Sequence, residues 1–429
     1  MLEISSQLKR YMDGLADNNY FNGAVLVGYK GEILLKEGYG QASYQYSIPN
    51  NTTTKFRIGS LTKAFTAMAI LMLHEQGRLK LTDSLVQHLP EFRDWEAVTI
   101  HHLLSNTSGI PCFTSFPDYW TKTMRLPATI AQFFESIKEM PLEFTPGEKM
   151  EYSNSGYLIL TAIIEKISGQ SYADYLQDSI IVPLGLTNTG VDNGRTIVES
   201  LATGHTVWER VVHTDFIDMS FPLGVYGMYS NLEDLYKWSQ ALQRSELLDE
   251  KLQQQMFTGN PYGYGWFLEE LPEKKASHFG DINGFVSYFE INLHQDLTVI
   301  VLSNINITPV SQMSQDLANI VLGKSASFVE IPSKVTKTIP FDKFTGTYAN
   351  GRQEIKFDFK EELFATIPKM YGVPYKFKLV PVLADDERVV FKSDFIHDTY
   401  EFKLNGHGDI ELFELTDCYG LKSEYRKND

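Results

Sequence analysis

One strongly apolar helical segment constrains the fold of this chain more than any other feature. Between residues 62 and 76 apolar side chains occur on almost every side of a helix, and little polar face remains. Gly77 provides a natural end for this helix. Because exposed apolar surface is unfavourable in water, we expect the helix to be central and buried. A chain of 429 residues that is 43% hydrophobic can build such a core, and two domains are expected at this length.

Strand patterns lie on both sides of this helical region. Residues 24–29 and 32–37 flank Lys30-Gly31 and predict a β-hairpin, and residues 286–292 and 298–303 predict two further paired strands. Helices are expected over residues 157–168, from Ser230 in a capping box with Glu233, and over residues 311–322. The first part of the chain therefore begins and ends in strands, with helices between them.

The pattern changes in the last hundred residues. Residues 323–340 are rich in Ser, Lys, Thr and Pro, which is typical of a linker. Beyond them apolar residues alternate with charged ones, as in Ile355-Lys356-Phe357 and Tyr400-Glu401-Phe402. We expect a first domain over residues 1–328, a linker over 329–340 and a small antiparallel β domain over 341–429, which carries no nucleophile pattern and packs on or covers the first.

Composition excludes several classes of function. Acidic residues outnumber basic ones 54 to 38, giving a net charge of -16, which argues against a nucleic-acid or anionic-membrane surface. Cys112 and Cys418 lie far apart and are interpreted as packing residues. No apolar run has the roughly 18 residues of a membrane span, and the N-terminus lacks a signal-peptide pattern. We expect a soluble protein with a small-molecule or peptide substrate, cytoplasmic as the chain stands and extracytoplasmic if a signal peptide has been removed.

The helix that is expected to be buried starts with a pair of reactive residue types. In Ser60-Leu61-Thr62-Lys63 the serine and lysine share one helix face, and the lysine can take the proton that the serine must lose before it attacks a carbonyl. The alternative is that Ser60 caps the helix and Lys63 extends to water. Ser6 and Lys9 have the same spacing, but they lie in a polar helix where Lys9 would be solvated.

A second pattern, Tyr152-Ser153-Asn154, offers a phenol for proton transfer and an amide for a substrate. Equal triplets begin at Tyr20, Tyr229 and Tyr348, so the triplet alone has little meaning. The ordinary interpretation of each is a turn asparagine beside a packed tyrosine.

Three segments in one order change this assessment: residues 56–63 (FRIGSLTK), residues 146–157 with PGE and YSNSGY, and residues 278–285 (HFGDINGF). Together they resemble the serine β-lactamase and penicillin-binding superfamily, in particular the class C β-lactamases, DD-peptidases and related esterases. Residues 99–109 (TIHHLLSNTSG) resemble another stretch of that group. The resemblance runs from about residue 22 to 322. It implies an α/β fold in which an antiparallel sheet is flanked by helices.

The resemblance also implies roles for individual residues. Ser60 is the expected nucleophile, Lys63 its proton partner and Tyr152 the general base, while Asn154 contacts the lysine and a substrate amide. His278-Phe279-Gly280 occupies the place of a Lys-Thr-Gly triplet, so His278 and Gly280 are expected beside the substrate. The backbone N–H groups of Ser60 and Asp281 would form the oxyanion hole. No metal and no cofactor are expected.

Two departures from the family pattern affect the substrate. Histidine replaces a permanently charged lysine at His278, which makes strict β-lactamase activity less favoured, and we hypothesise that its imidazolium binds a substrate carboxylate. Asp281 follows the triplet where many relatives have a small residue, so a carboxylate lies near the expected oxyanion hole.

Other residues are assigned to packing. His101 and His102 are expected in a packed loop, because no cysteine or carboxylate cluster accompanies them. Several aromatic residues are candidates for the wall of a cleft but are more often core or rim: Trp208, Tyr226, Tyr229, Tyr262, Tyr264 and Trp266.

The expected function is a metal-free serine acyl-transfer hydrolase that forms an ester at Ser60 and is deacylated by water. The leading substrate is a D-Ala-D-Ala-type peptide, as in penicillin-binding carboxypeptidases. A carboxylesterase or a weak class C-like β-lactamase is the alternative. A non-catalytic alternative is a sensor or scaffold that binds β-lactams or wall fragments without turnover.

Overall fold

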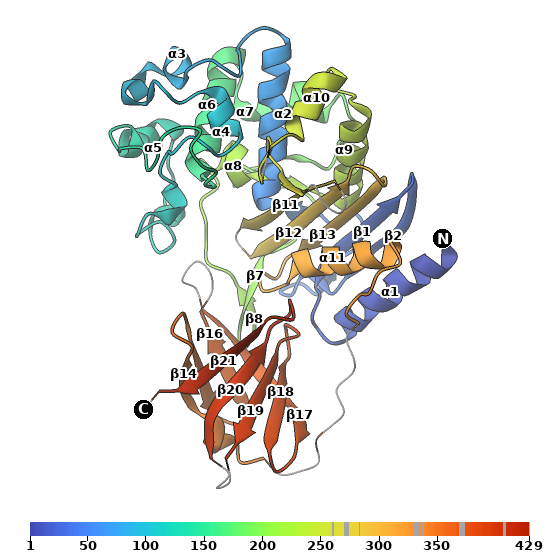
Figure 1. Ribbon diagram of the computed structural model, residues 1–429. Helices are drawn as coiled ribbons and strands as arrows, with labels where there is room; N and C mark the ends of the chain where they lie inside the picture. The colour runs from blue at the N-terminus through green and yellow to red at the C-terminus, as the bar shows by residue number, and fades with distance from the viewer. Residues whose placement is uncertain are drawn as a thin grey trace.

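The computed structural model describes residues 1–259, 261–269, 274–282, 284–328, 335, 339–368, 374–405 and 409–428. The expected linker, residues 329–340, lies largely outside the described residues. The architecture is a domain with a helix-flanked sheet, followed by a β-barrel domain (Figure 1). The expected β-lactamase-like α/β fold with an all-β C-terminal domain is confirmed, whereas the exact domain limits stay a prediction.

The first domain is organised by a six-stranded antiparallel sheet in the order β10-β11-β12-β13-β1-β2. Its strands are β1 (Gly23–Tyr29), β2 (Glu32–Tyr39), β10 (Phe267–Glu269), β11 (Lys275–Ile282), β12 (Phe285–Asn292) and β13 (Leu297–Ser303). Strand β1 pairs with β13 over its whole length, from Gly23 opposite Ser303 to Tyr29 opposite Leu297. The two ends of the domain therefore meet in the sheet, as the sequence predicted.

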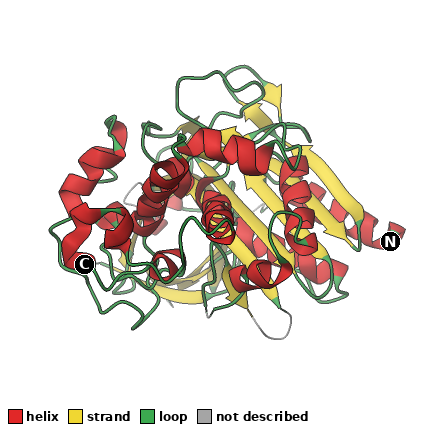
Figure 2. Ribbon diagram, turned by 90° about the horizontal axis from the view of Figure 1, so that it is seen from above, coloured by secondary structure: helices red, strands yellow, loops and turns green. Residues whose placement is uncertain are grey.

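Helices cover both faces of this sheet (Figure 2). Side chains of β1 alternate, so that Val25 and Val27 pack under α1 (Leu2–Asp17) and α11 (Val310–Val321). Ala24 and Leu26 point to the opposite face and join the larger core. That core contains α2 (Thr62–Glu75), α6 (Asn154–Ser168) and α9 (Leu232–Arg244). Helix α2 is buried on all sides, as its composition predicted.

The helical region and its small sheets contain further short elements. The helices are α3 (Leu85–His88), α4 (Ile100–Leu104), α5 (Ile130–Ile137), α7 (Tyr172–Leu176), α8 (Leu223–Tyr226) and α10 (Glu250–Met256). The strands are β3 (Gln41–Ser43), β4 (Ile48–Pro49), β5 (Phe56–Arg57), β6 (Gly190–Val191) and β9 (Met228–Ser230). Strand β9 pairs with both β5 and β6, and this three-stranded sheet leads the chain into the turn that carries Ser60.

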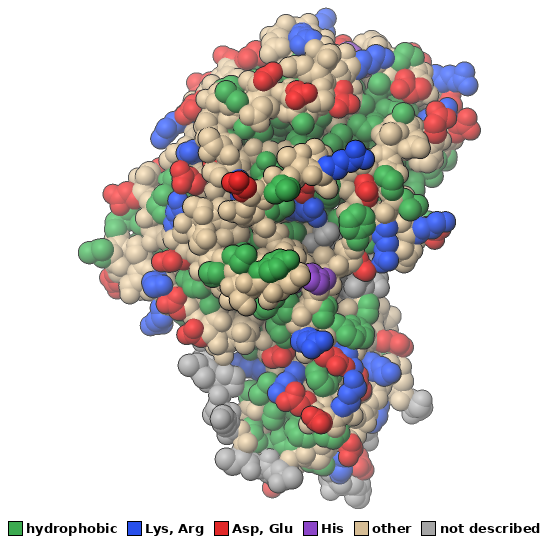
Figure 3. Space-filling model, turned by 180° about the vertical axis from the view of Figure 1, so that it is seen from behind, with side chains coloured by type: hydrophobic (Ala, Val, Ile, Leu, Met, Phe, Trp, Pro, Cys, Tyr) green, Lys and Arg blue, Asp and Glu red, His purple; other side chains and the backbone are tan. Residues whose placement is uncertain are grey.

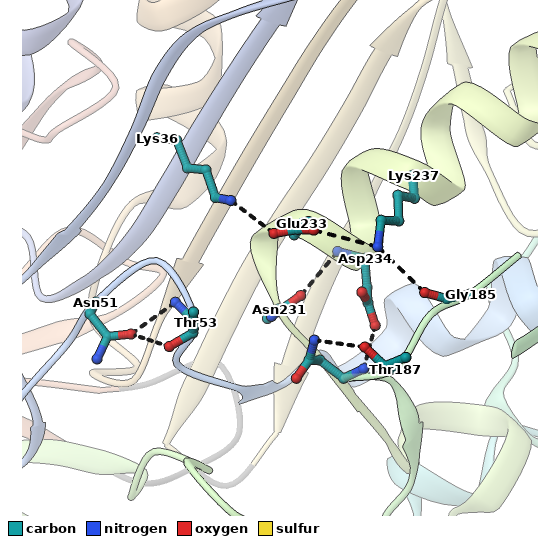
Figure 4. Close-up of polar contacts among 10 residues, drawn as sticks. Lys36, Asn51, Thr53, Gly185, Thr187, Asn231, Glu233, Asp234 and Lys237 are labelled. Carbon is teal, nitrogen blue, oxygen red and sulfur yellow. Dashed lines mark hydrogen bonds and ion pairs between the residues drawn. The ribbon is translucent and has the colours of Figure 1, made fainter.

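Helix α9 begins one residue later than its capping pattern suggested. Asn231 is its N-cap and accepts a hydrogen bond from the backbone N–H of Asp234 at 3.0 Å (Figure 4). Ser230 instead ends β9 and bonds to Thr189. Glu233 in the first turn pairs with Lys36 of β2 at 3.1 Å, which joins the helix to the edge of the sheet (Figure 4).

The C-terminal domain is an eight-stranded antiparallel barrel, closed by pairing of β16 with β17. Its strands are β14 (Gly346–Ala349), β15 (Glu354–Phe359), β16 (Leu363–Ile367), β17 (Tyr375–Ala384), β18 (Arg388–Ser393), β19 (Thr399–Leu404), β20 (Ile410–Thr416) and β21 (Lys422–Lys427). The alternating residues Phe357, Tyr400 and Phe402 fill its core, as expected.

A hairpin of the first domain extends this barrel sheet. Strands β7 (His205–Trp208) and β8 (Arg210–His213) pair with each other, and β7 also pairs in parallel with β17. Figure 1 shows the hairpin reaching from the helical domain down to the barrel. This link between the domains was not predicted from the sequence. Within the described residues, no helix combines the length and apolar character needed to cross a bilayer.

Candidate active site

Ser60 lies in a tight turn that is pressed against β11. The turn, Gly59–Leu61, precedes α2, and Gly59 has a φ of +53°, a conformation that favours glycine. A Cβ on Gly59 would lie 2.7 Å from the backbone nitrogen of Asp281, and one on Gly280 would lie 2.1 Å from the carbonyl oxygen of Ile58. The two glycines therefore allow the backbone of β11 to approach the residue next to Ser60.

Lys63 is buried in the first turn of α2, so the alternative in which it extends to water is wrong. Its Nζ donates to Ser60 Oγ at 3.0 Å, to Asn154 Oδ1 at 2.8 Å and to the carbonyl oxygen of Val225 at 2.9 Å. Three acceptors satisfy the three protons of an ammonium group. Burial nevertheless lowers the pKa of Lys63 well below its usual value, so the free amine is accessible nearer neutral pH.

Tyr152 and Asn154 approach the same lysine from the start of α6. The ring of Tyr152 has its centroid 4.9 Å from Lys63 Nζ, and Asn154 binds that atom directly. The Nδ2 group of Asn154 donates to Thr114 Oγ1 at 3.0 Å, which fixes the orientation of the amide. The structure thus brings Ser60, Lys63, Tyr152 and Asn154 together, although they come from segments 90 residues apart.

His278 is buried in a neutral form. Its Nδ1 lies 2.8 Å from the carbonyl oxygen of Phe279, which can only accept, so Nδ1 carries the proton. Its Nε2 then accepts from the hydroxyl of Tyr262 at 3.0 Å. Burial and the nearby Lys63 lower the pKa of His278 to about 3. The two hydrogen bonds and the lowered pKa argue against the hypothesis that an imidazolium binds a substrate carboxylate at neutral pH, although His278 does line the cavity described next.

A cavity of about 300 Å³ opens over Ser60 and has a mostly apolar wall. It is lined by Ser60, Thr114, Trp120, Met124, Tyr152, Asn154, Thr214, Asp215, Ile217, Tyr226, Phe267, His278, Phe279, Asp281, Ile282, Gly284 and Asn306. Asp281 thus borders the cavity, as does Asp215, which pairs with Arg125 at 3.0 Å. None of the described lining residues is a lysine or an arginine.

Sequence reasoning missed parts of this site. Thr114, Asp215 and Ile217 belong to loops without a recognisable motif, so no sequence signal identified them. Cys112 is more than a packing residue, because its Sγ accepts from the backbone N–H of Asn154 at 3.3 Å. Of the aromatic candidates for the wall, Tyr226 lines the cavity.

Of the residues assigned to structural roles, Lys9 is solvated as expected, whereas His101 and His102 lie on helix α4 and not in a packed loop, and His101 is exposed. Lys9 is exposed and pairs with Asp13. His101 bonds to Tyr264, and His102 caps α4 together with Thr99. The described residues contain no group of three side chains suited to a metal ion.

Comparison with known sequences and structures places this geometry in a family. The family described as Beta-lactamase matches residues 8–322. The chain belongs to this family. It is therefore a member of the serine β-lactamase and penicillin-binding hydrolases, as the motif order indicated.

Two curated relatives show the extent of the similarity. Penicillin-binding protein 4* of Bacillus subtilis is 30% identical over 374 residues, which is 80% of this chain and 82% of that protein. The protein Flp of Staphylococcus aureus strain MRSA252 is 31% identical over 312 residues, 68% of this chain but 61% of Flp.

Solved structures share the fold. The octameric penicillin-binding protein homologue of Pyrococcus abyssi has a TM-score of 0.67 at 22% identity, covering 98% of this chain and 99% of that one. Both domains are thus included in the similarity. The D-amino acid amidase of Ochrobactrum anthropi SV3 has a TM-score of 0.64 at 22% identity, covering 74% of this chain and 99% of its own.

Proposed function

We propose that this protein is a serine hydrolase that forms an acyl ester at Ser60 and releases it to water. The observation that carries the proposal is the direct contact of the buried Lys63 amine with Ser60 Oγ at 3.0 Å. A lysine with a lowered pKa can accept the serine proton, which a solvated lysine cannot do at neutral pH. No cofactor is needed for this chemistry.

Each neighbouring group has a role in the proposed reaction. Ser60 Oγ attacks the substrate carbonyl carbon while its proton passes to the Lys63 amine, and Lys63 then gives this proton to the leaving group as the carbonyl–leaving-group bond breaks. In deacylation the Tyr152 phenolate accepts a proton from the water that attacks the ester and returns it to Ser60 Oγ as the ester bond breaks. Asn154 holds Lys63 in position. The backbone N–H groups of Ser60 and Asp281 are proposed to stabilise the oxyanion, which is supported by the close approach of β11 to the Ser60 turn.

The proposed substrate is a peptide or amide of the D-Ala-D-Ala type. The similarity to penicillin-binding protein 4* and to a D-amino acid amidase supports an amide bond to a D-residue. His278 and Gly280 of β11 would lie beside this substrate. Because His278 is neutral, substrate recognition is proposed to depend on hydrogen bonds and apolar contacts with the cavity wall.

Ester hydrolysis is a second candidate activity. It is favoured by the mostly apolar cavity wall, in which no described residue is a lysine or arginine that would select a carboxylate. A neutral ester requires no such cation. Weak β-lactamase activity stays an alternative, as does a sensor that is acylated without turnover.

The test uses purified protein, a fluorescent penicillin and p-nitrophenyl butyrate. We expect nitrophenol release and penicillin labelling to be lost in Ser60→Ala, with at least about a hundredfold loss of turnover. Ser6→Ala is the matched control, because Ser6 has the same spacing to a lysine but lies on the exposed face of α1. Lasting label without ester turnover would instead identify a sensor, and activity that survives in Ser60→Ala would end the proposal.

A further inference from the structure

The hairpin β7–β8 connects the catalytic cavity with the C-terminal barrel. Immediately after β8, Thr214, Asp215 and Ile217 form part of the wall of the catalytic cavity. Within the hairpin, Val207 of β7 is fully buried in the core of the barrel domain. The same short segment therefore belongs to the active-site wall and to the packing between the domains (Figure 1).

The root of the hairpin is fixed to the central sheet. The backbone N–H of His205 donates to the carbonyl oxygen of Asn304 at 2.9 Å. On the other side, Gly284 in the turn between β11 and β12 approaches so closely that a Cβ would lie 2.5 Å from the nitrogen of His205. Because Gly284 itself lines the catalytic cavity, the hairpin starts beside the site.

The tip of the hairpin is held by the barrel. Glu209 forms the turn with a φ of +61°, and its backbone N–H donates to the carbonyl oxygen of Lys376 at 2.6 Å. Its carboxylate pairs with Lys376 at 2.8 Å and with Lys360 at 3.0 Å. Lys376 is buried and also binds Asp358 at 2.9 Å. A backbone hydrogen bond and the ion pairs of a buried lysine therefore join the tip of the hairpin to the barrel.

A second cavity, of about 180 Å³, lies at this junction. Its lining residues are Thr206, Val207, Trp208, His213, Asp215 and Pro374. Asp215 lines both cavities, so the second is adjacent to the catalytic one. Pro374 comes from the barrel domain, so both domains build the wall.

The chemistry of this second cavity suits part of an extended ligand. Trp208 is 45% exposed, and exposed indoles commonly serve as contact surfaces for a partner molecule. Thr206 is 91% buried, and its Oγ1 has no hydrogen-bond partner within the described part of the chain. A buried hydroxyl without a partner is unfavourable, and a ligand amide group would satisfy it. Viewed from behind, hydrophobic side chains and a histidine are exposed near the boundary between the two domains (Figure 3).

We propose that this junction is a second subsite of the catalytic cleft, which binds an apolar residue of an extended peptide substrate away from the cleaved bond. The inference rests on the proposed function at Ser60. Trp208 and Thr206 contact the substrate in the subsite. Glu209 and Lys376 are positioning residues, because they act through the hairpin. The barrel domain thereby contributes to substrate selection as well as to packing.

The experiment compares p-nitrophenyl butyrate with two extended substrates. One is a p-nitrophenyl ester with an N-acetyl tripeptide on the acyl side, and the other is a depsipeptide extended by three residues on the leaving side, each with a terminal leucine. The wild-type protein is expected to have at least a tenfold higher kcat/KM for one of the extended substrates than for the short ester. The readout is the kcat/KM of the preferred extended substrate divided by the kcat/KM of the short ester. A general loss of activity lowers both values and leaves this ratio unchanged.

Variants then locate the preference. Trp208→Ala should reduce this ratio about tenfold, mainly through KM, and Glu209→Gln should reduce it through the position of the hairpin. Glu209→Asp keeps the carboxylate, so its ratio should lie between those of Glu209→Gln and the wild type. Glu362→Gln is the matched control, because Glu362 pairs with Lys378, two residues along β17 from Lys376, and does not contact the hairpin in the described structure. This control should leave the ratio within about twofold.

Two results would overturn the subsite. One is a wild-type protein that does not prefer either extended substrate, and the other is a ratio that Trp208→Ala and Glu209→Gln leave unchanged. Failure of the proposed function would give a different result. For each of the three substrates, the wild-type protein and Ser60→Ala would then have the same rate of hydrolysis.

Discussion

The imidazole of His278 is held in one neutral form by its two hydrogen-bond partners. Phe279 accepts from Nδ1, and the Tyr262 hydroxyl donates to Nε2. Protonation of Nε2 would place a positive charge in a buried position next to Lys63 and would remove the acceptor for the Tyr262 hydroxyl. The pKa of His278 is therefore lowered. The place of His278 in a motif could be recognised from the sequence. Its neutral state could not, because it depends on burial and on the position of Tyr262 in the folded chain.

The neutral ring gives a prediction about pH. Because the pKa of His278 is lowered to about 3, the ring stays neutral throughout the range from about pH 5.5 to 8. We expect the kcat/KM of a D-Ala-D-Ala peptide and of a neutral ester of similar size to vary in parallel over this range. Steady-state assays in buffers of constant ionic strength measure this. A decline with rising pH for the anionic peptide alone would show that the imidazolium is involved.

At the scale of elements, the sequence predicted what periodicity can encode. Helix α2 and the strands β1, β2, β12 and β13 have long apolar patterns, and their positions agree with expectation. Helix α6 begins at Asn154, three residues earlier than expected, because its first turn carries the polar residues Asn154 and Ser155, of which Asn154 contacts Lys63. The hairpin β7–β8 was not predicted, since its four-residue strands are stabilised by β17, whose Lys376 pairs with Trp208 from about 170 residues away in the sequence.

The contact between β11 and the Ser60 turn gives a prediction at the same scale. In Gly280→Ala the new methyl group would lie 2.1 Å from Ile58 O and 2.4 Å from Ser287 Oγ, so β11 must move away from the turn. We expect roughly a hundredfold loss of kcat, because a displacement of about 1 Å misaligns the reacting groups. Gly156→Ala is the control, since its Cβ meets no atom closer than 3.5 Å. Equal kcat values for the two variants would contradict the proposed place of β11 beside the substrate.

At the scale of the whole molecule, a loop of the barrel joins it to the first domain. The Tyr20 hydroxyl donates to the carbonyl oxygen of Ser393 at 3.1 Å, and its ring stacks on His397 at 5.7 Å. Asp398 in the same loop is buried and accepts from the backbone N–H of Cys418 at 2.8 Å. The length of the chain predicted two domains, but no local pattern identified this contact, because its partners are more than 370 residues apart.

The buried carboxyl of Asp398 makes the stability of this junction depend on pH. Burial, with the nearby Asp417, raises its pKa from 3.8 to about 7, so the unfolded chain ionises at lower pH than the folded protein. The contribution of Asp398 to the free energy of unfolding should therefore fall as pH rises from about 4 to about 7 and then level off. Asp398→Asn keeps the acceptor for Cys418 but removes the charge, so it should stabilise the protein more at pH 8 than at pH 5, by about 1 to 3 kcal/mol. Denaturant titrations at the two pH values, with Asp409→Asn on the barrel surface as control, measure this difference. An Asp398→Asn effect of the same size at both pH values would show that Asp398 does not titrate in this range.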